Sequence, residues 1–96
     1  MAIDKVELEV IDRQCSYGIL SGIRYLIHYL YHEAKDIGFI PNRHNITATY
    51  LFARVTLDVL YETTSCRETR RTITFLYQNW YRFINKFLKF YETGRN

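Results

Sequence analysis

The sequence predicts an all-α protein, an antiparallel bundle of three long helices that forms one domain over residues 1–96. Apolar residues recur at intervals of three and four along most of the chain, which is the spacing of amphipathic helices. Only four glycines and one proline are present to interrupt such helices. Residues 6–10 alternate apolar and charged side chains as a strand does, but no other segment could pair with them, so a helix is favoured there too.

The first helix is predicted over residues 5–37. Asp4 stands three residues before a glutamate, an arrangement that resembles the capping box at a helix start. Gly38 can adopt the left-handed conformation that ends a helix, and Pro41 follows soon after it. Residues 3–14 could continue this helix or form an extra N-terminal helical segment, and the sequence leaves both arrangements open.

The second helix is predicted over residues 45–63, after a turn in which Asn42 or Asn45 supplies the N-terminal cap. The third helix is predicted over residues 65–93, because Ser65 begins a Ser-x-x-Glu capping box. The connections between the three helices are short, so neighbouring helices should run antiparallel.

The second helix is apolar on two opposite faces, and one three-helix unit can cover only one of them. The first face contains Ile46, Tyr50, Ala53, Leu57, Leu60 and Tyr61. The second face contains Ala48, Leu51, Phe52, Val55 and Val59. Narrow polar strips separate the two faces, and Thr49 and Thr56 form one of them. We therefore expect a second molecule to cover the second face.

The first helix carries a further candidate surface for self-association. Gly18 and Gly22 remove two side chains from one side of the helix, so another backbone can approach closely. Tyr25 and Tyr29 continue that side at heptad spacing. The alternatives are a close crossing inside one molecule or a break in the helix. The predicted interface of a symmetric homodimer comprises Gly18, Gly22, Tyr25, Tyr29, Leu51, Val55 and Val59.

Basic residues give the competing hypothesis, a regulator that binds nucleic acid. The chain has a net charge of +3, and its excess of cations lies in the second half. The candidate contacts to phosphate or another anion are Arg67, Arg70, Arg71, Arg82, Lys86 and Lys89, all on the predicted third helix. Phe75 or a tyrosine could stack on a base. Cations near a helix C-terminus also suit the helix dipole, so this pattern alone is weak.

No catalytic or metal-binding pattern stands out. His28 and His32 are one helical turn apart, which suits metal binding, but they share a polar face with the cations Arg24 and Lys35. The two cysteines have no metal-ligand spacing, and no nucleophile is accompanied by a base and an orienting group. We therefore predict no enzyme activity, no cofactor and no metal.

The sequence favours a small interaction module, such as a regulator, an adaptor or an accessory subunit. Such a module would self-associate or dock on a larger protein through its apolar helix faces. No segment has the length of uncharged sequence that a membrane span needs, and the first ten residues do not resemble a signal peptide. A cytoplasmic location is the default expectation.

Overall fold

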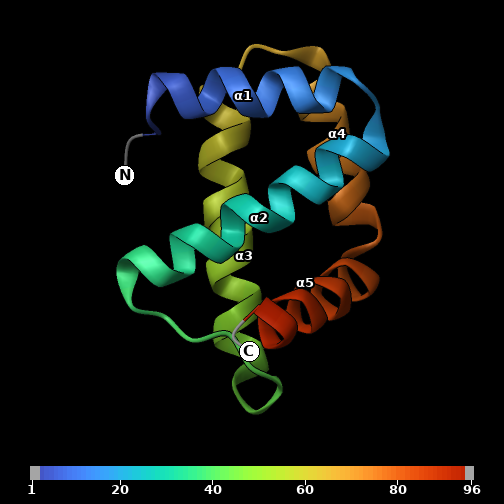
Figure 1. Ribbon diagram of the computed structural model, residues 1–96. Helices are drawn as coiled ribbons and strands as arrows, with labels where there is room; N and C mark the ends of the chain where they lie inside the picture. The colour runs from blue at the N-terminus through green and yellow to red at the C-terminus, as the bar shows by residue number, and fades with distance from the viewer. Residues whose placement is uncertain (1–2, 95–96) are drawn as a thin grey trace.

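The computed structural model describes residues 3–94, and within them it contains five α-helices and no strand (Figure 1). The helices are α1 (Lys5–Ser16), α2 (Ile19–Ile37), α3 (Ile46–Thr63), α4 (Arg67–Gln78) and α5 (Trp80–Gly94), and a short 3-10 turn, η1 (Arg43–Asn45), precedes α3. The all-α prediction is confirmed, and so is the second predicted helix. The prediction of three long helices is wrong, because the first and third are each broken into two.

The first predicted helix breaks at Gly18, which separates α1 from α2. Gly18 has a φ of 138°, a backbone conformation that residues with a side chain rarely adopt. The chain therefore turns sharply, and α1 folds back across α2 and α4. The N-terminal segment is thus a separate helix, one of the two arrangements that the sequence left open. At the other end of α2 the predicted stop is confirmed, since Gly38 is left-handed with a φ of 74°.

The third predicted helix breaks at Asn79, between α4 and α5. The side-chain amide of Asn79 donates a hydrogen bond to the carbonyl of Phe75 (2.9 Å), which offers the backbone an alternative to the helical ladder. The backbone carbonyl of Asn79 then accepts the first hydrogen bond of α5, from the amide of Phe83 (2.9 Å). As a result α5 leaves in a new direction.

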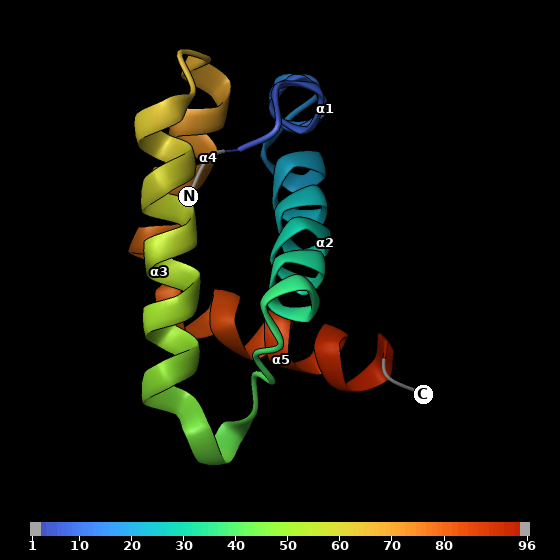
Figure 2. The ribbon, with the colours of Figure 1, turned by 90° about the vertical axis from the view of Figure 1, so that its left-hand side faces the viewer.

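The helices cross one another instead of forming an antiparallel bundle. Figure 2 shows α3 and α4 together on one side and α1 and α2 on the other, while α5 runs across the lower end of both. In Figure 1, α1 lies across the upper ends of α3 and α4. The fully buried core side chains come from all five helices and include Ile11, Leu26, Leu30, Leu57, Leu60, Ile73, Leu76 and Phe87.

A polar cluster around Asp12 attaches α1 to the connection between α3 and α4. One carboxylate oxygen of Asp12 accepts hydrogen bonds from the hydroxyls of Thr64 (2.8 Å) and Thr69 (2.6 Å). The hydroxyl of Thr64 also accepts the backbone N–H of Cys66 (3.0 Å). The predicted capping box at Ser65 is therefore wrong: α4 begins after Cys66, and the helix has no side-chain cap at that residue.

Candidate functional site

The outer side of α3 carries apolar side chains that the protomer leaves exposed. Leu51 keeps 64% of its surface exposed and Val55 keeps 45%, while Val59 is half-buried. The opposite side, with Ala53 and Leu57, is fully buried. The protomer thus covers one apolar face of this helix and leaves the second largely open, as the two-sided pattern predicts.

The supposed polar strip of α3 faces the core. Thr49 and Thr56 are buried, and each donates its hydroxyl to a carbonyl one turn earlier, of Asn45 (3.0 Å) and Phe52 (2.8 Å) respectively. A threonine that satisfies its hydroxyl in this way presents mainly its methyl group to the core. The prediction that these threonines separate two faces at the surface is therefore wrong.

A groove runs between α3 and the segment that follows α2, and we call it the α3 groove. It has a volume of about 360 Å³ and is lined by Ile37, Phe39, Ala48, Leu51, Phe52, Val55 and Thr56. The rings of Phe39 and Phe52 contact each other, with centroids 5.2 Å apart. Ile37 and the neighbouring Ile40 are more than half exposed. No charged side chain lines this groove.

The predicted interface on α2 is used inside the protomer. Gly22 is buried, and a Cβ atom added to it would lie 2.9 Å from the Sγ of Cys15 and 3.1 Å from the side chain of Thr72. The glycine thus lets α1 and α4 approach α2 closely, which was the intramolecular alternative. Gly18 forms the break before α2. Gly22 is therefore not free to contact a partner, whereas Gly18 is exposed at the break.

The two tyrosines of that predicted interface also serve the protomer. Tyr29 is 5% exposed. Tyr25 is half-buried and donates its hydroxyl to a carboxylate oxygen of Glu7 on α1 (2.7 Å). Burial and this hydrogen bond raise the pKa of Tyr25 to about 12, so its phenol stays protonated. Both residues help to fix α1 against α2.

A group of carboxylates lies beside this contact. Asp4, Glu7, Glu33 and Asp36 line one hollow together with Tyr29. Burial raises the pKa of Glu33, and the negative charges of Asp36 and Glu7 raise it further. Sequence periodicity does not reveal this group, because its members come from opposite ends of two helices. Within residues 3–94, no set of histidines, cysteines and carboxylates is arranged to hold a metal ion.

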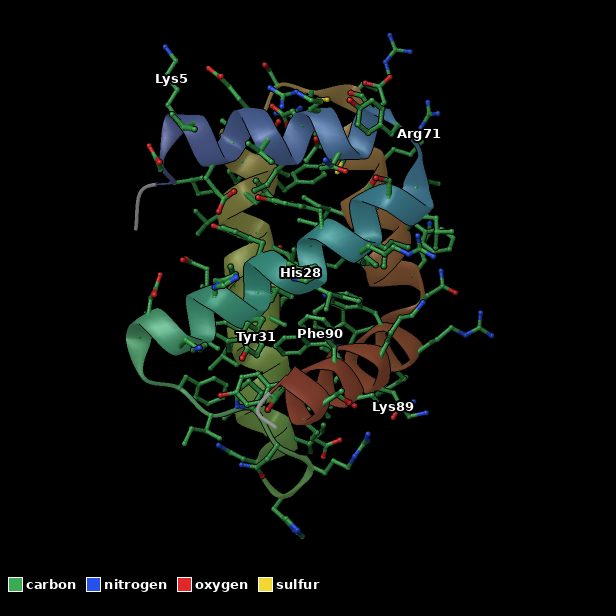
Figure 3. All side chains as sticks on the ribbon, in the orientation of Figure 1. Lys5, His28, Tyr31, Arg71, Lys89 and Phe90 are labelled. Atoms are coloured by element: carbon green, nitrogen blue, oxygen red, sulfur yellow. The ribbon has the colours of Figure 1, made fainter. Side chains whose placement is uncertain are left out.

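The six predicted anion-contacting cations fall into two separate groups. The break at Asn79 separates the group on α4 from the group on α5, and Figure 3 shows Arg71 and Lys89 far apart along one side of the molecule. Arg70 is already engaged, since its Nε donates to the carbonyl of Thr64 (3.0 Å) and its guanidinium lies 5.2 Å from the ring of Tyr61. A single basic stripe is therefore not formed.

The α5 group gains partners that the sequence did not indicate. Lys86 lines a hollow of about 220 Å³ together with Arg24 and His28 of α2, and with Ile27 and Phe90. The sequence alone places Arg24 and His28 on a polar face of the first predicted helix. Only the crossing of α2 and α5 brings them beside Lys86, and helical periodicity does not reveal which helices cross.

Arg54 is fixed on the flank of α3 that faces α4. Its guanidinium lies 3.8 Å from the centroid of the Tyr77 ring, and its Nε is 3.5 Å from a carboxylate oxygen of Asp58. Tyr77 donates its hydroxyl to the same carboxylate oxygen. Burial and the hydrogen bond to Asp58 raise the pKa of Tyr77. Arg54 and Asp58 thus form an ion pair one helical turn apart, and both side chains remain about half exposed.

The described helices include none that is long and apolar enough to cross a membrane. Comparisons of the chain with protein-family models, with curated proteins and with solved structures found no match.

Proposed function

We propose that this protein is a small non-enzymatic interaction module that self-associates through the α3 groove. The observation that supports the proposal is the pair of exposed side chains Leu51 and Val55 on an uncharged groove. Contiguous apolar surface of this kind on a small domain is typical of an interaction site. Covering a leucine or a valine side chain completely contributes about 1.5–3 kcal/mol, and each copy would supply both.

The occupant that fits best is a second copy in antiparallel orientation, with a two-fold axis near Val55. This residue lies close to the middle of the 18-residue helix α3. With 1.5 Å of rise per residue, the axis places Leu51 of one copy at the level of Val59 of the other. Large and branched apolar side chains would then meet along the whole contact, which a self-complementary interface requires.

A charged pair lies beside the groove and would take part in this contact. Arg54 and Asp58 lie on the same flank of α3, four residues apart. In an antiparallel pair with its axis near Val55, Arg54 of one copy lies within about 3 Å, along the helix axis, of Asp58 of the other. The two copies of Arg54 are equally close, also about 3 Å apart along the axis, while the two copies of Asp58 are about 9 Å apart.

The test is the molar mass in solution, measured by light scattering coupled to size-exclusion chromatography. The wild type should elute at twice its chain mass of 11.6 kDa. Leu51→Glu should elute as a monomer, because it places a charge in the contact, and its circular dichroism spectrum should be unchanged. The matched control is Leu20→Glu, since Leu20 is 55% exposed on α2 and lies outside the groove. The control should remain a dimer.

The orientation is tested by a disulfide. In a Cys66→Ser background, Val55→Cys should form a disulfide-linked dimer under mild oxidation, because the axis brings the two copies of residue 55 together. A wild-type mass of one chain, or a dimeric Leu51→Glu, would overturn self-association through this groove. A dimer in which Val55→Cys does not cross-link would overturn the antiparallel geometry alone.

A further inference from the structure

Two hollows follow one another along the crossing of α2 and α5. The larger one contains Arg24, His28 and Lys86 around the apolar side chains of Ile27 and Phe90. The second, of about 40 Å³, lies one helical turn away on both helices and is lined by Ile23, Phe75, Leu76, Asn79, Arg82 and Phe83. We refer to the two together as the α2–α5 cleft.

The α2–α5 cleft is positively charged and has no acidic lining residue. Arg24, Arg82 and Lys86 are all exposed on its rims. The ion pairs found within residues 3–94 lie elsewhere, between Arg43 and Glu92 and between Arg54 and Asp58. The three cations are therefore available to a negatively charged ligand.

The cations form a row instead of a single point. Arg82, Lys86 and Lys89 share one face of α5, at spacings of four and three residues. At 1.5 Å per residue the row extends over about 10 Å. Arg24 adds a charge from the opposite rim. An extended polyanion could contact this row at several points, whereas a single phosphate group could use only part of it.

Aromatic rings lie at the base of the cleft. Phe90 is half-buried between α2 and α5, as Figure 3 shows, and its ring meets that of His28 edge to face with centroids 4.7 Å apart. Phe75, in the neighbouring hollow, keeps 38% of its surface exposed although it is a large apolar side chain. Exposed rings beside a row of cations are the combination that binds unpaired bases and their phosphates.

We propose that the α2–α5 cleft binds single-stranded nucleic acid, with phosphates on Arg24, Arg82 and Lys86 and a base stacked on Phe75. The cations line a concave surface between two helices, and among the described helices none stands apart from the others to enter the major groove of a duplex. A single strand, whose bases are free to turn inward, fits that shape. This inference does not depend on self-association, because the cleft and the α3 groove have no lining residue in common.

The experiment measures fluorescence anisotropy with a labelled oligothymidylate of about 12 nucleotides, within the site size of small single-strand binding domains. Binding should weaken as salt rises, with a slope in log K against log salt of about −2, because roughly three phosphates are contacted. A duplex of the same length should bind more weakly.

Two double variants with the same change in charge locate the site. Arg24→Gln with Lys86→Gln should weaken binding at least about tenfold, since two phosphate contacts are lost. Arg67→Gln with Arg71→Gln removes two exposed cations from α4, outside the cleft, and should change the affinity less than about threefold. Phe75→Leu should weaken binding about fivefold and leave the salt slope unchanged, because stacking does not involve counterions.

Three results would overturn the proposal. The first is an equal loss of affinity in the two double variants, which would mean that only net charge matters. The second is tighter binding to the duplex. The third is equally strong competition by polyglutamate, which would identify an acidic protein as the ligand class. The Leu51→Glu variant should bind the oligonucleotide as the wild type does, so the two proposals can fail separately.

Discussion

The small-residue face of α2 and the outer face of α3 are both helix faces that the sequence predicts to be covered. In the fold, the protomer covers the first and leaves the second exposed. Both patterns indicate a helix face that needs a neighbour. On α2 the neighbours are α1 and α4 of the same molecule, and Gly22 is buried between them. On α3 no element of the protomer covers Leu51. Periodicity therefore predicts that a face will be covered, but not by which chain.

The difference arises from the chain break at Gly18. If residues 5–37 formed one helix, α1 would continue the axis of α2 and could not pack on it. The positive φ of Gly18 turns the chain, and α1 returns to cover the face that begins at Gly22. The part of the chain that follows α3 has no such turn toward Leu51, because α4 packs on another side of α3.

The largest effect should come from filling the space at Gly22. Gly22→Leu adds a branched side chain where even a Cβ atom would lie 2.9 Å from the Sγ of Cys15. Because overpacking a tight helix crossing forces the backbones apart, we expect a loss of about 3 kcal/mol in the free energy of unfolding, measured by urea denaturation.

The comparison variant is Leu51→Glu, which changes the uncovered face. When the variant is measured as a monomer, its unfolding free energy should differ by no more than about 0.5 kcal/mol from that of a monomeric reference such as Val55→Glu. If Gly22→Leu unfolded at the same urea concentration as the wild type, the intramolecular role of Gly22 would be wrong and a partner interface on α2 would again be plausible.

The next largest effect concerns the anchor that keeps α1 in place. Asp12→Ala removes the acceptor for the hydroxyls of Thr64 and Thr69, both of which are buried. We expect a loss of about 2 kcal/mol, since hydrogen bonds to charged groups are strong and unpaired buried hydroxyls are costly. Thermal unfolding followed by circular dichroism measures it.

Its control is Arg13→Ala, which truncates an exposed neighbour on α1. That variant should unfold close to the wild-type temperature. An equal loss of stability in the two variants would show that the Asp12 cluster is not what attaches α1 to the rest of the fold.

The sequence was sufficient for those parts of the fold that depend on local signals. The stop at Gly38 and the span of α3 follow from a glycine and from an apolar repeat, and both are confirmed. The break at Asn79 was missed because the apolar pattern runs through it without a change of phase. The burial of Thr49 was missed because a threonine counts as polar until its hydroxyl finds a backbone carbonyl.

Of the two candidate sites, likewise, one could be predicted from local sequence signals and the other could not. The exposure of Leu51 follows from counting apolar faces on one helix, so it could be predicted. The α2–α5 cleft could not, because Arg24 and Lys86 are 62 positions apart in the sequence and meet only where two helices cross. The position of that crossing depends on the breaks at Gly18 and Asn79 together, and neither break leaves a trace in the charge pattern.

The smallest effect should come from Glu33, near the C-terminal end of α2, beside the carboxylates of Glu7 and Asp36. Burial, Asp36 and Glu7 raise the pKa of Glu33 above its ordinary value of 4.5 in the folded protein. As the pH falls, the carboxylate of Glu33 therefore becomes protonated at a higher pH in the folded state than in the unfolded state. The ionised carboxylate costs stability above the folded-state pKa, and this cost is relieved as the pH falls through that pKa toward 4.5.

Glu33→Gln removes that cost at neutral pH and also removes a negative charge near the C-terminal end of the helix dipole. Because the group is only partly buried, the gain at pH 7 should be about 0.5 kcal/mol, and it should shrink as the pH approaches 4.5. Thermal unfolding across this range measures it, with the exposed Glu9→Gln on α1 as the control. A Glu33→Gln variant that is less stable than the wild type at pH 7 would contradict this expectation. It would mean that the carboxylates of α1 and α2 attract a cation that offsets their repulsion. Electrostatic attraction would then contribute to the packing of α1 on the covered face of α2.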